Sequence, residues 1–263
     1  LKSGVAIFDD LRQGVREIEF LLDPAAGDVR IAATEPIAAG VLPIIVARLA
    51  RQYPRMTIYV TQSPIAVLEY RTPQYRDLRE RNVDLVFGPI VRPIAEDDLE
   101  VELLFEERPV VVAGIRNGWA RRRKVELADL IDEPWCMPPP DTLVGSRCVE
   151  AFRACGLDVP KRTVLSSSIQ LYIGLLANER FLTMLPDSLL RFSGKRLGIK
   201  ALPIDLAVPP RLIGIVTLKN RTISSAAQLF IQTAREVAKP IAKVKYPVTT
   251  ARRTEPAAAT GKD

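Results

Sequence analysis

Three consecutive serines, Ser166, Ser167 and Ser168, are the best candidate in this sequence for binding chemistry. They directly precede an apolar segment, Ile169–Asn178, that predicts an α-helix. The first amides of a helix have no partner within the helix and lie at the positive end of its dipole, so they can bind an anion. The serines therefore predict a site for a carboxylate, or they simply cap the helix with their hydroxyl groups.

The residue types exclude several kinds of catalysis. The sequence has no histidine, and its three cysteines, Cys136, Cys148 and Cys155, form no Cys-x-x-Cys pair. A Ser-His-Asp triad, a Cys-His pair and a histidine zinc site are therefore excluded, and no glycine fingerprint for a phosphate or a dinucleotide is present. We expect no enzyme activity, no cofactor and no metal, although lysine, serine and carboxylate chemistry stay open. Reduced thiols fit a cytoplasmic protein, and Cys148 and Cys155 are predicted to be buried.

Length and composition are those of a soluble globular protein. The chain has 263 residues, of which 48% are hydrophobic and 26% charged, and this length suits one large or two small domains. Its longest uncharged apolar stretch, residues 36–47, is too short to span a membrane. Because the chain opens at Leu1 without a signal peptide, we expect a fragment of a longer protein whose missing part precedes it.

Most of the charged clusters read as solvated surface. The formal net charge is +6, and residues 242–263 hold five cations and two anions, which gives +3 in a predicted disordered tail. The basic run at residues 121–124 is predicted to be a surface loop, with a nucleic-acid patch as the alternative. The acidic pairs at residues 97–98 and 106–107 are predicted to be solvated turns.

The segment from residue 27 to residue 88 alternates strands and helices. Residues 28–33 alternate as a strand does, and a helix is expected from Pro36 to residue 52, with Ile37, Val41, Ile44, Ile45 and Leu49 on its apolar face. A strand at residues 56–60, a helix at residues 75–82 and a buried strand at residues 83–88 follow. This order predicts parallel strands.

The remaining segments continue the alternation. Strands are expected at residues 99–104, 110–113, 135–137, 161–165, 181–185 and 199–204 and at Arg211–Leu218. Helices are expected at residues 146–155, Ile169–Asn178 and residues 224–238.

The first 22 residues carry a separate pattern. Apolar side chains recur every seven residues, with Leu11 and Ile18 at the complementary positions; the repeating residues are Leu1, Phe8, Val15 and Leu22. Such heptads are typical of a coiled coil, and the alternative is an amphipathic helix packed on its own domain.

Several of these segments, taken in order, resemble one protein family. The segments are residues 27–33, Leu42 and Pro43, residues 51–54, 78–86 and 126–130, Pro134 and Trp135, and residues 182–186. The chain resembles the linker helix and effector-binding domain of LysR-type transcriptional regulators, from Leu1 to about residue 240. One departure is Arg81, where relatives commonly have glycine, so that Asn82 is expected to take the left-handed turn.

The resemblance implies an α/β fold of two Rossmann-like subdomains joined by two crossovers, as in type II periplasmic binding proteins. Residues 1–23 would be the linker and dimerisation helix, residues 27–107 and 211–240 the first subdomain, residues 108–210 the second, and residues 241–263 a disordered tail. A winged helix-turn-helix, the DNA-binding domain of the family, would precede Leu1 and is missing here.

The resemblance also places an effector in the cleft between the subdomains. Residues expected to line it are Thr34, Glu35, Pro36, Ile37, Gln62, Ser63, Phe87, Gly88, Pro139, Asp141, Ser166, Ser167, Ser168, Leu185 and Pro186. The effector is expected to be an organic acid or an amphoteric metabolite. Glu35 opposes an acid unless an arginine or the effector's own amine pairs with it.

The predicted function is therefore effector sensing by a DNA-binding transcriptional regulator, in which binding changes the geometry of a homodimer or homotetramer. Promoter DNA would be contacted only through the missing winged helix-turn-helix, and no membrane is involved. The alternative is a solute-binding protein of a transport system, which would be a monomer without a coiled-coil segment.

Overall fold

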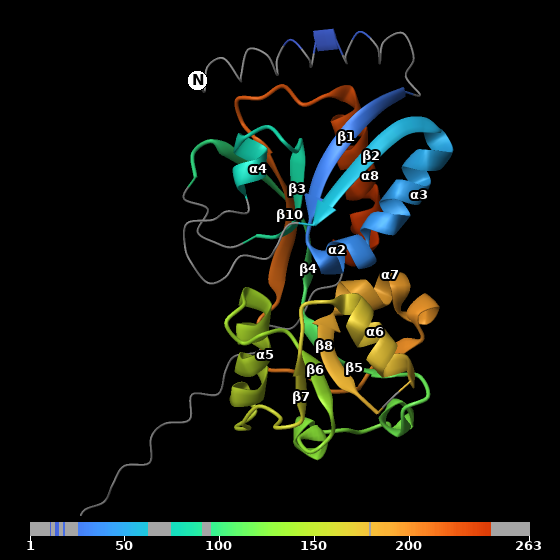
Figure 1. Cartoon of the computed structure of the whole chain (residues 1–263), viewed down its shortest axis with the longest axis vertical. Helices are drawn as coiled ribbons and strands as arrows, with labels where there is room; N and C mark the ends of the chain where they lie inside the picture. Colours follow the sequence, from blue (N-terminus) through green and yellow to red (C-terminus); the bar gives the residue numbers. More distant parts are fainter. Residues whose placement is uncertain are drawn as a thin grey trace, which may run out of the picture.

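The chain forms two lobes, each built around its own five-stranded sheet (Figure 1). The structure, a computed structural model, describes residues 26–62, 75–90, 96–178 and 180–242, and residues 11, 14, 15 and 18 of the N-terminal segment. The first sheet has the order β2-β1-β3-β10-β4 and the second the order β7-β6-β8-β5-β9. We call the lobe that contains the first sheet the first lobe and the other the second lobe.

In the first lobe, parallel and antiparallel strands share one sheet. Its strands are β1 (Ala26–Ala33), β2 (Arg55–Gln62), β3 (Leu85–Pro89), β4 (Leu99–Glu107) and β10 (Arg211–Leu218). β1 runs parallel to β2 and β3, whereas β10 runs antiparallel to β3 and β4. The carboxyl ends of the three parallel strands therefore lie at the same edge of the sheet.

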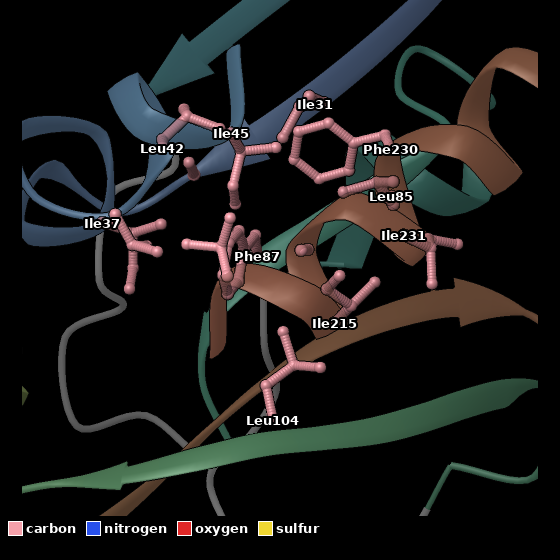
Figure 2. Close-up of a cluster of buried hydrophobic side chains, with 14 of the residues drawn as sticks. Ile31, Ile37, Leu42, Ile45, Leu85, Phe87, Leu104, Ile215, Phe230 and Ile231 are labelled. Carbon is pink, nitrogen blue, oxygen red and sulfur yellow. The ribbon is translucent and has the colours of Figure 1, made fainter. Parts of the chain in front are cut away.

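Helices cover both faces of this sheet. On one face lie α2 (Glu35–Ala39), α3 (Leu42–Gln52) and α8 (Ser225–Ala242); on the other lies α4 (Arg76–Arg79). Figure 2 shows how Phe230 of α8 meets the strand residues Ile31, Leu85 and Phe87. The rings of Phe87 and Phe230 meet edge to face at 6.5 Å, an arrangement that aromatic pairs favour.

The helix predicted from Pro36 to residue 52 is two helices. The prediction of one helix is wrong because Pro43 has no amide hydrogen to donate and its ring would clash with the carbonyl group four residues earlier. The chain bends at Gly40, whose φ and ψ are −100° and −90°, and α3 then begins with Pro43 in its first turn. A Cβ at Gly40 would lie 3.2 Å from the Cα of Leu189 in the second lobe, so this bend brings the two lobes together.

In the second lobe, helices again cover both faces of the sheet. The strands are β5 (Pro109–Gly114), β6 (Trp135–Met137), β7 (Thr163–Leu165), β8 (Leu182–Pro186) and β9 (Ile199–Ala201). One face is covered by α5 (Leu143–Ala154) and the 3₁₀ helices η2 (Gly118–Arg121) and η3 (Leu127–Leu130), the other by α6 (Ile169–Asn178) and α7 (Asp187–Leu197). β6 runs parallel to β7 and β8. The sequence did not predict α7.

Some local predictions need correction. The helix expected at residues 75–82 is only the single turn α4, and Arg81 itself takes the left-handed turn, with φ +63°, in place of Asn82. Helix α8 continues to Ala242 because Ile241 packs into the core of the first lobe, so residues 241 and 242 do not belong to the predicted tail. Residues 243–263 lie outside the described residues.

Two side chains also differ in burial from the predictions. Cys148 is buried, as expected, but Cys155 is exposed because it follows the last turn of α5. Glu107 was predicted in a solvated turn, yet its side chain is only 1% exposed, because it ends β4 and pairs with Arg211.

The N-terminal heptad segment is described at four residues. Residues 11, 14, 15 and 18 are helical, and Leu11, Val15 and Ile18 are 56–62% exposed. Leu1, Phe8 and Leu22 lie outside the described residues. Within the part of the chain that the structure describes, no helix is long and apolar enough to cross a membrane.

A buried ion pair ties the two connections between the lobes. The chain leaves the first lobe after Glu107 and returns to it at Arg211, and these residues are partners in the β4–β10 register. Arg211 Nη2 lies 2.6 Å from Glu107 Oε1, and Ser188 of α7 donates a hydrogen bond to the same carboxylate. Sheet membership thus changes between Glu107 and Pro109 and again before Arg211.

Replacing Arg211 by alanine should leave the buried carboxylate of Glu107 without its cationic partner. Removing one partner of a buried ion pair costs about 3–5 kcal/mol, so we expect Arg211→Ala to lower the free energy of unfolding by that amount in urea denaturation. The matched control is Arg235→Ala, because Arg235 pairs with Glu102 on the surface and such a pair contributes at most about 1 kcal/mol. If both variants lost the same free energy of unfolding, the buried pair of Arg211 and Glu107 would not have the stabilising role described here.

Candidate functional site

The carboxyl ends of the parallel strands in both lobes face one cavity. It has a volume of about 440 Å³, which is in the range of small-molecule sites. In an open α/β sheet, ligands bind beyond the carboxyl ends of the strands. The cavity is lined by Glu35, Pro36 and Gln62 of the first lobe and by Pro138, Thr142, Val144, Ser167, Ile169, Tyr172, Met184, Leu185 and Pro186 of the second.

The structure brings six of the predicted cleft residues to this cavity. They are Glu35, Pro36, Gln62, Ser167, Leu185 and Pro186. Each lies at or just beyond the end of a parallel strand, which is the feature that the sequence pattern could locate. Their role in binding an effector stays a prediction.

The other predicted residues that the structure describes do not line the cavity. Thr34, Ile37 and Phe87 are buried in the first lobe, where Thr34 Oγ1 has no hydrogen-bond partner. Gly88 packs against the Thr34 side chain. Pro139, Asp141, Ser166 and Ser168 lie beside the cavity without lining it. Ser63 lies outside the described residues.

Six lining residues were not predicted. Thr142 and Val144 contribute because α5 begins at Leu143, three residues earlier than expected, with Thr142 as its cap: the Gly145 amide donates to Thr142 Oγ1 at 3.0 Å. Threonine is a favoured N-cap residue, so Thr142 could have indicated this earlier helix start in the sequence. Ile169, Tyr172 and Met184 face the cavity because of how α6 and β8 pack in the lobe, which the sequence pattern does not specify. Pro138 directly follows β6.

The three serines mainly complete the start of α6. Ser166 Oγ accepts the Ser168 amide at 3.1 Å, and Ser168 Oγ accepts the Leu171 amide at 3.3 Å. The Ile169 amide donates instead to Glu35 Oε1, at 2.8 Å, across the cleft. Side chains of the protein therefore already cap this helix end, which favours capping over an open anion site.

Tyr172 lines the second-lobe side of the cavity, and its phenol group is neutral. Its hydroxyl group donates to the carbonyl oxygen of Ser166. Burial raises the pKa of Tyr172, and the nearby Cys136, Cys148 and Glu35 add to the rise. The phenol is therefore a hydrogen-bonding group at neutral pH and not a charged one.

A small pocket lined by arginine side chains adjoins the cavity, next to the point where the chain returns to the first lobe at Arg211. This small hollow shares Val144, Met184, Leu185 and Pro186 with the cavity, and it is also lined by Arg108, Arg147 and Arg211. Burial, followed by repulsion from Arg211, lowers the pKa of Arg147. Burial also raises the pKa of Cys148 to about 12, so this thiol stays protonated and unreactive.

A larger hollow, about 740 Å³, lies on the second lobe away from the cleft. Three of its lining residues are Arg116, Arg122 and Arg180, but Arg116 donates to the Ala177 carbonyl oxygen at 2.8 Å and Arg180 pairs with Glu133 at 3.1 Å. Arg116 and Arg180 thus make structural contacts within the second lobe. Among the described residues, no three histidine, cysteine or acidic side chains group as a metal site requires.

A family model, the LysR substrate binding domain, matches residues 23–239. The chain belongs to the LysR substrate-binding domain family. The transcriptional dual regulator GltC of Bacillus subtilis is 24% identical over 217 residues, which are 82% of this chain and 69% of that regulator. The regulator GbpR of Azospirillum brasilense is 23% identical, over 89% of this chain and 67% of its own length.

Solved structures of LysR regulators share the fold of this domain. The BenM effector-binding domain with its effector benzoate has a TM-score of 0.59 and 21% identity, and the match covers 84% of this chain and 96% of that one. The QuiR effector-binding domain in complex with shikimate has a TM-score of 0.57 and 20% identity, over 82% of this chain and 98% of that one. The two-lobe α/β fold predicted from the sequence is thereby confirmed.

Gly145 fixes one wall of the cleft in this LysR domain. A Cβ at this position would lie 1.8 Å from the carbonyl oxygen of Pro139. We expect Gly145→Ala to push the loop of residues 138–142 away from α5 and to lower the free energy of unfolding by about 1–3 kcal/mol in urea denaturation. Gly174→Ala on α6 is the control, since nothing lies within 4 Å of its added Cβ and alanine favours a helix by up to about 1 kcal/mol. A stable Gly145→Ala domain would contradict the tight contact.

Proposed function

We propose that this LysR domain senses a small molecule bound in the cavity between its two lobes. The observation that carries the proposal is the cavity itself, whose walls come from the strand ends of both lobes. A ligand that touches both lobes stabilises one relative arrangement of them, because it interacts differently with open and closed forms. The subdomains would be residues 27–107 with 211–240 and residues 108–210.

The relatives support small-molecule sensing. GltC and GbpR are transcriptional regulators, and the BenM and QuiR structures contain benzoate and shikimate. These similarities favour a regulator over a transport protein or an enzyme. For this chain the effector class predicted from the sequence, an organic acid or an amphoteric metabolite, stays a prediction.

A metabolite screen tests the cleft as the binding site. The domain is titrated calorimetrically with a panel of organic acids, amino acids, amines and neutral metabolites. We expect each ligand found to lose at least about tenfold in affinity, or ~1.4 kcal/mol, in Val144→Trp, because the indole takes up part of the cavity. Val159→Trp, an exposed position outside the cavity, is the matched control. Ligands that bind Val144→Trp as tightly as the wild type would place the effector elsewhere.

We also propose that the domain acts within a homodimer or homotetramer. Leu11, Val15 and Ile18 expose apolar side chains at heptad spacing, and Ile44 of α3 and Tyr59 and Val60 of β2 are exposed on the first lobe. Such surfaces suit contact with a second copy. Promoter DNA would be bound by a winged helix-turn-helix outside this sequence, in the cytoplasm, and effector binding would change the spacing of these DNA-binding units.

Charges introduced into the heptad segment should weaken self-association. We expect Leu11→Glu combined with Ile18→Glu to raise the dimer dissociation constant at least about tenfold, because unpaired carboxylates would face the partner helix. Sedimentation velocity over a concentration series measures this change. Val159→Glu, an exposed apolar position in the second lobe, should leave association unchanged. Unaltered association of the double variant would locate the dimer contact outside this segment.

A further inference from the structure

The cavity carries a single charged group among the described residues that line it. This group is the carboxylate of Glu35, at the start of α2. The remaining polar side chains, Gln62, Thr142, Ser167 and Tyr172, are neutral, and the rest of the lining is apolar. The described residues that line the cavity therefore carry one negative charge and no positive charge.

The Glu35 carboxylate is held in place by the opposite lobe. Its Oε1 accepts the amide of Ile169, the first residue of α6, at 2.8 Å. This amide is at the positive end of the helix dipole, where an acidic side chain makes a favourable contact. A carboxylate has two oxygens and several lone pairs, so it can accept further hydrogen bonds from a ligand while it keeps the Ile169 amide.

None of the arginine side chains that the structure describes lines the cavity beside Glu35. Arg108, Arg147 and Arg211 line the neighbouring hollow, which shares Val144 and Met184 with the cavity, and Arg108 pairs there with Asp205 at 3.2 Å. There Arg211 pairs with Glu107, and Arg147 donates to the carbonyl oxygen of Pro209. An anionic ligand would therefore meet Glu35 in a mostly apolar cavity, where charges are weakly screened.

We propose that Glu35 is a specificity-determining residue that selects the effector by its charge. The cleft accepts a small, largely apolar molecule with a cationic or neutral hydrogen-bond-donating head group next to Glu35, and it discriminates against a ligand whose only charge is a carboxylate. Repulsion of the wrong ligand contributes to such selectivity as much as attraction of the right one. The inference rests on the proposed function. Of the two predicted effector classes it favours the amphoteric one, whose ammonium group can pair with Glu35.

Three probes of nearly the same shape test this selectivity. Benzoate, benzamide and benzamidine share a phenyl ring and a planar head group, and their charges are −1, 0 and +1. Each is titrated into the ¹⁵N-labelled domain, and binding is followed through the amide resonances of cavity residues such as Gln62, Ile169 and Met184. We expect benzamidine to bind the wild type at least about tenfold more tightly than benzoate.

The isosteric variant Glu35→Gln separates charge from structure. Its amide oxygen can still accept from the Ile169 amide, so the lobe contact is kept while the charge is removed. We expect the preference for benzamidine over benzoate to fall at least about tenfold in this variant. Glu100→Gln is the control, because it removes one negative charge at an exposed position of β4 and should keep the wild-type preference.

The outcomes distinguish this inference from the proposed function. Probes that shift cavity resonances with a preference that Glu35→Gln does not alter, or benzoate that binds the wild type as tightly as benzamidine, would overturn the role of Glu35 and leave the cleft as the binding site. If none of the probes shifts a cavity resonance in any variant, the inference is overturned, and the metabolite screen then decides the cleft assignment by itself.

Discussion

The buried pair of Arg211 and Glu107 holds together the geometry on which the rest of the domain depends. Both connections between the lobes pass this pair, and Ser188 joins it from α7. Buried ion pairs contribute little net stability compared with well-packed apolar side chains, because both charges lose their hydration. Their directional contacts nevertheless fix the positions of the groups involved. The two lobes that supply the walls of the cleft are therefore joined at one fixed point.

Two further polar contacts span the lobes, where α2 meets α6 and α7. There the Glu35 carboxylate accepts the first amide of α6, and Ser193 of α7 donates to the Ala39 carbonyl oxygen of α2 at 3.2 Å. α2 thus belongs to the first lobe by sequence and packs against the second (Figure 1). Glu35 thus belongs both to the lining of the cavity and to the surface where the lobes meet.

The sequence predicted the strands well and the helices less completely. Alternating apolar residues located β1, and a strongly apolar run located β10, because a strand that is covered on both faces buries nearly all of its side chains. One helix from Pro36 to residue 52 was expected because the apolar spacing continues across Gly40, although the backbone does not. Helix α7 was missed because Pro186 looks like the end of a structured segment. In the cleft, residues at strand ends were predictable, but Tyr172 and Met184 depend on how whole elements pack.

The bend at Gly40 has a consequence for how such a domain diverges. A Cβ at Gly40 would lie 3.2 Å from the α-carbon of Leu189, so a side chain there would push the two backbones apart by a few tenths of an ångström. The close approach of the lobes at this point thus depends on the absence of a side chain. Gly40 and Leu189 are not among the residues that line the cavity, so the lining residues can be exchanged without altering this contact.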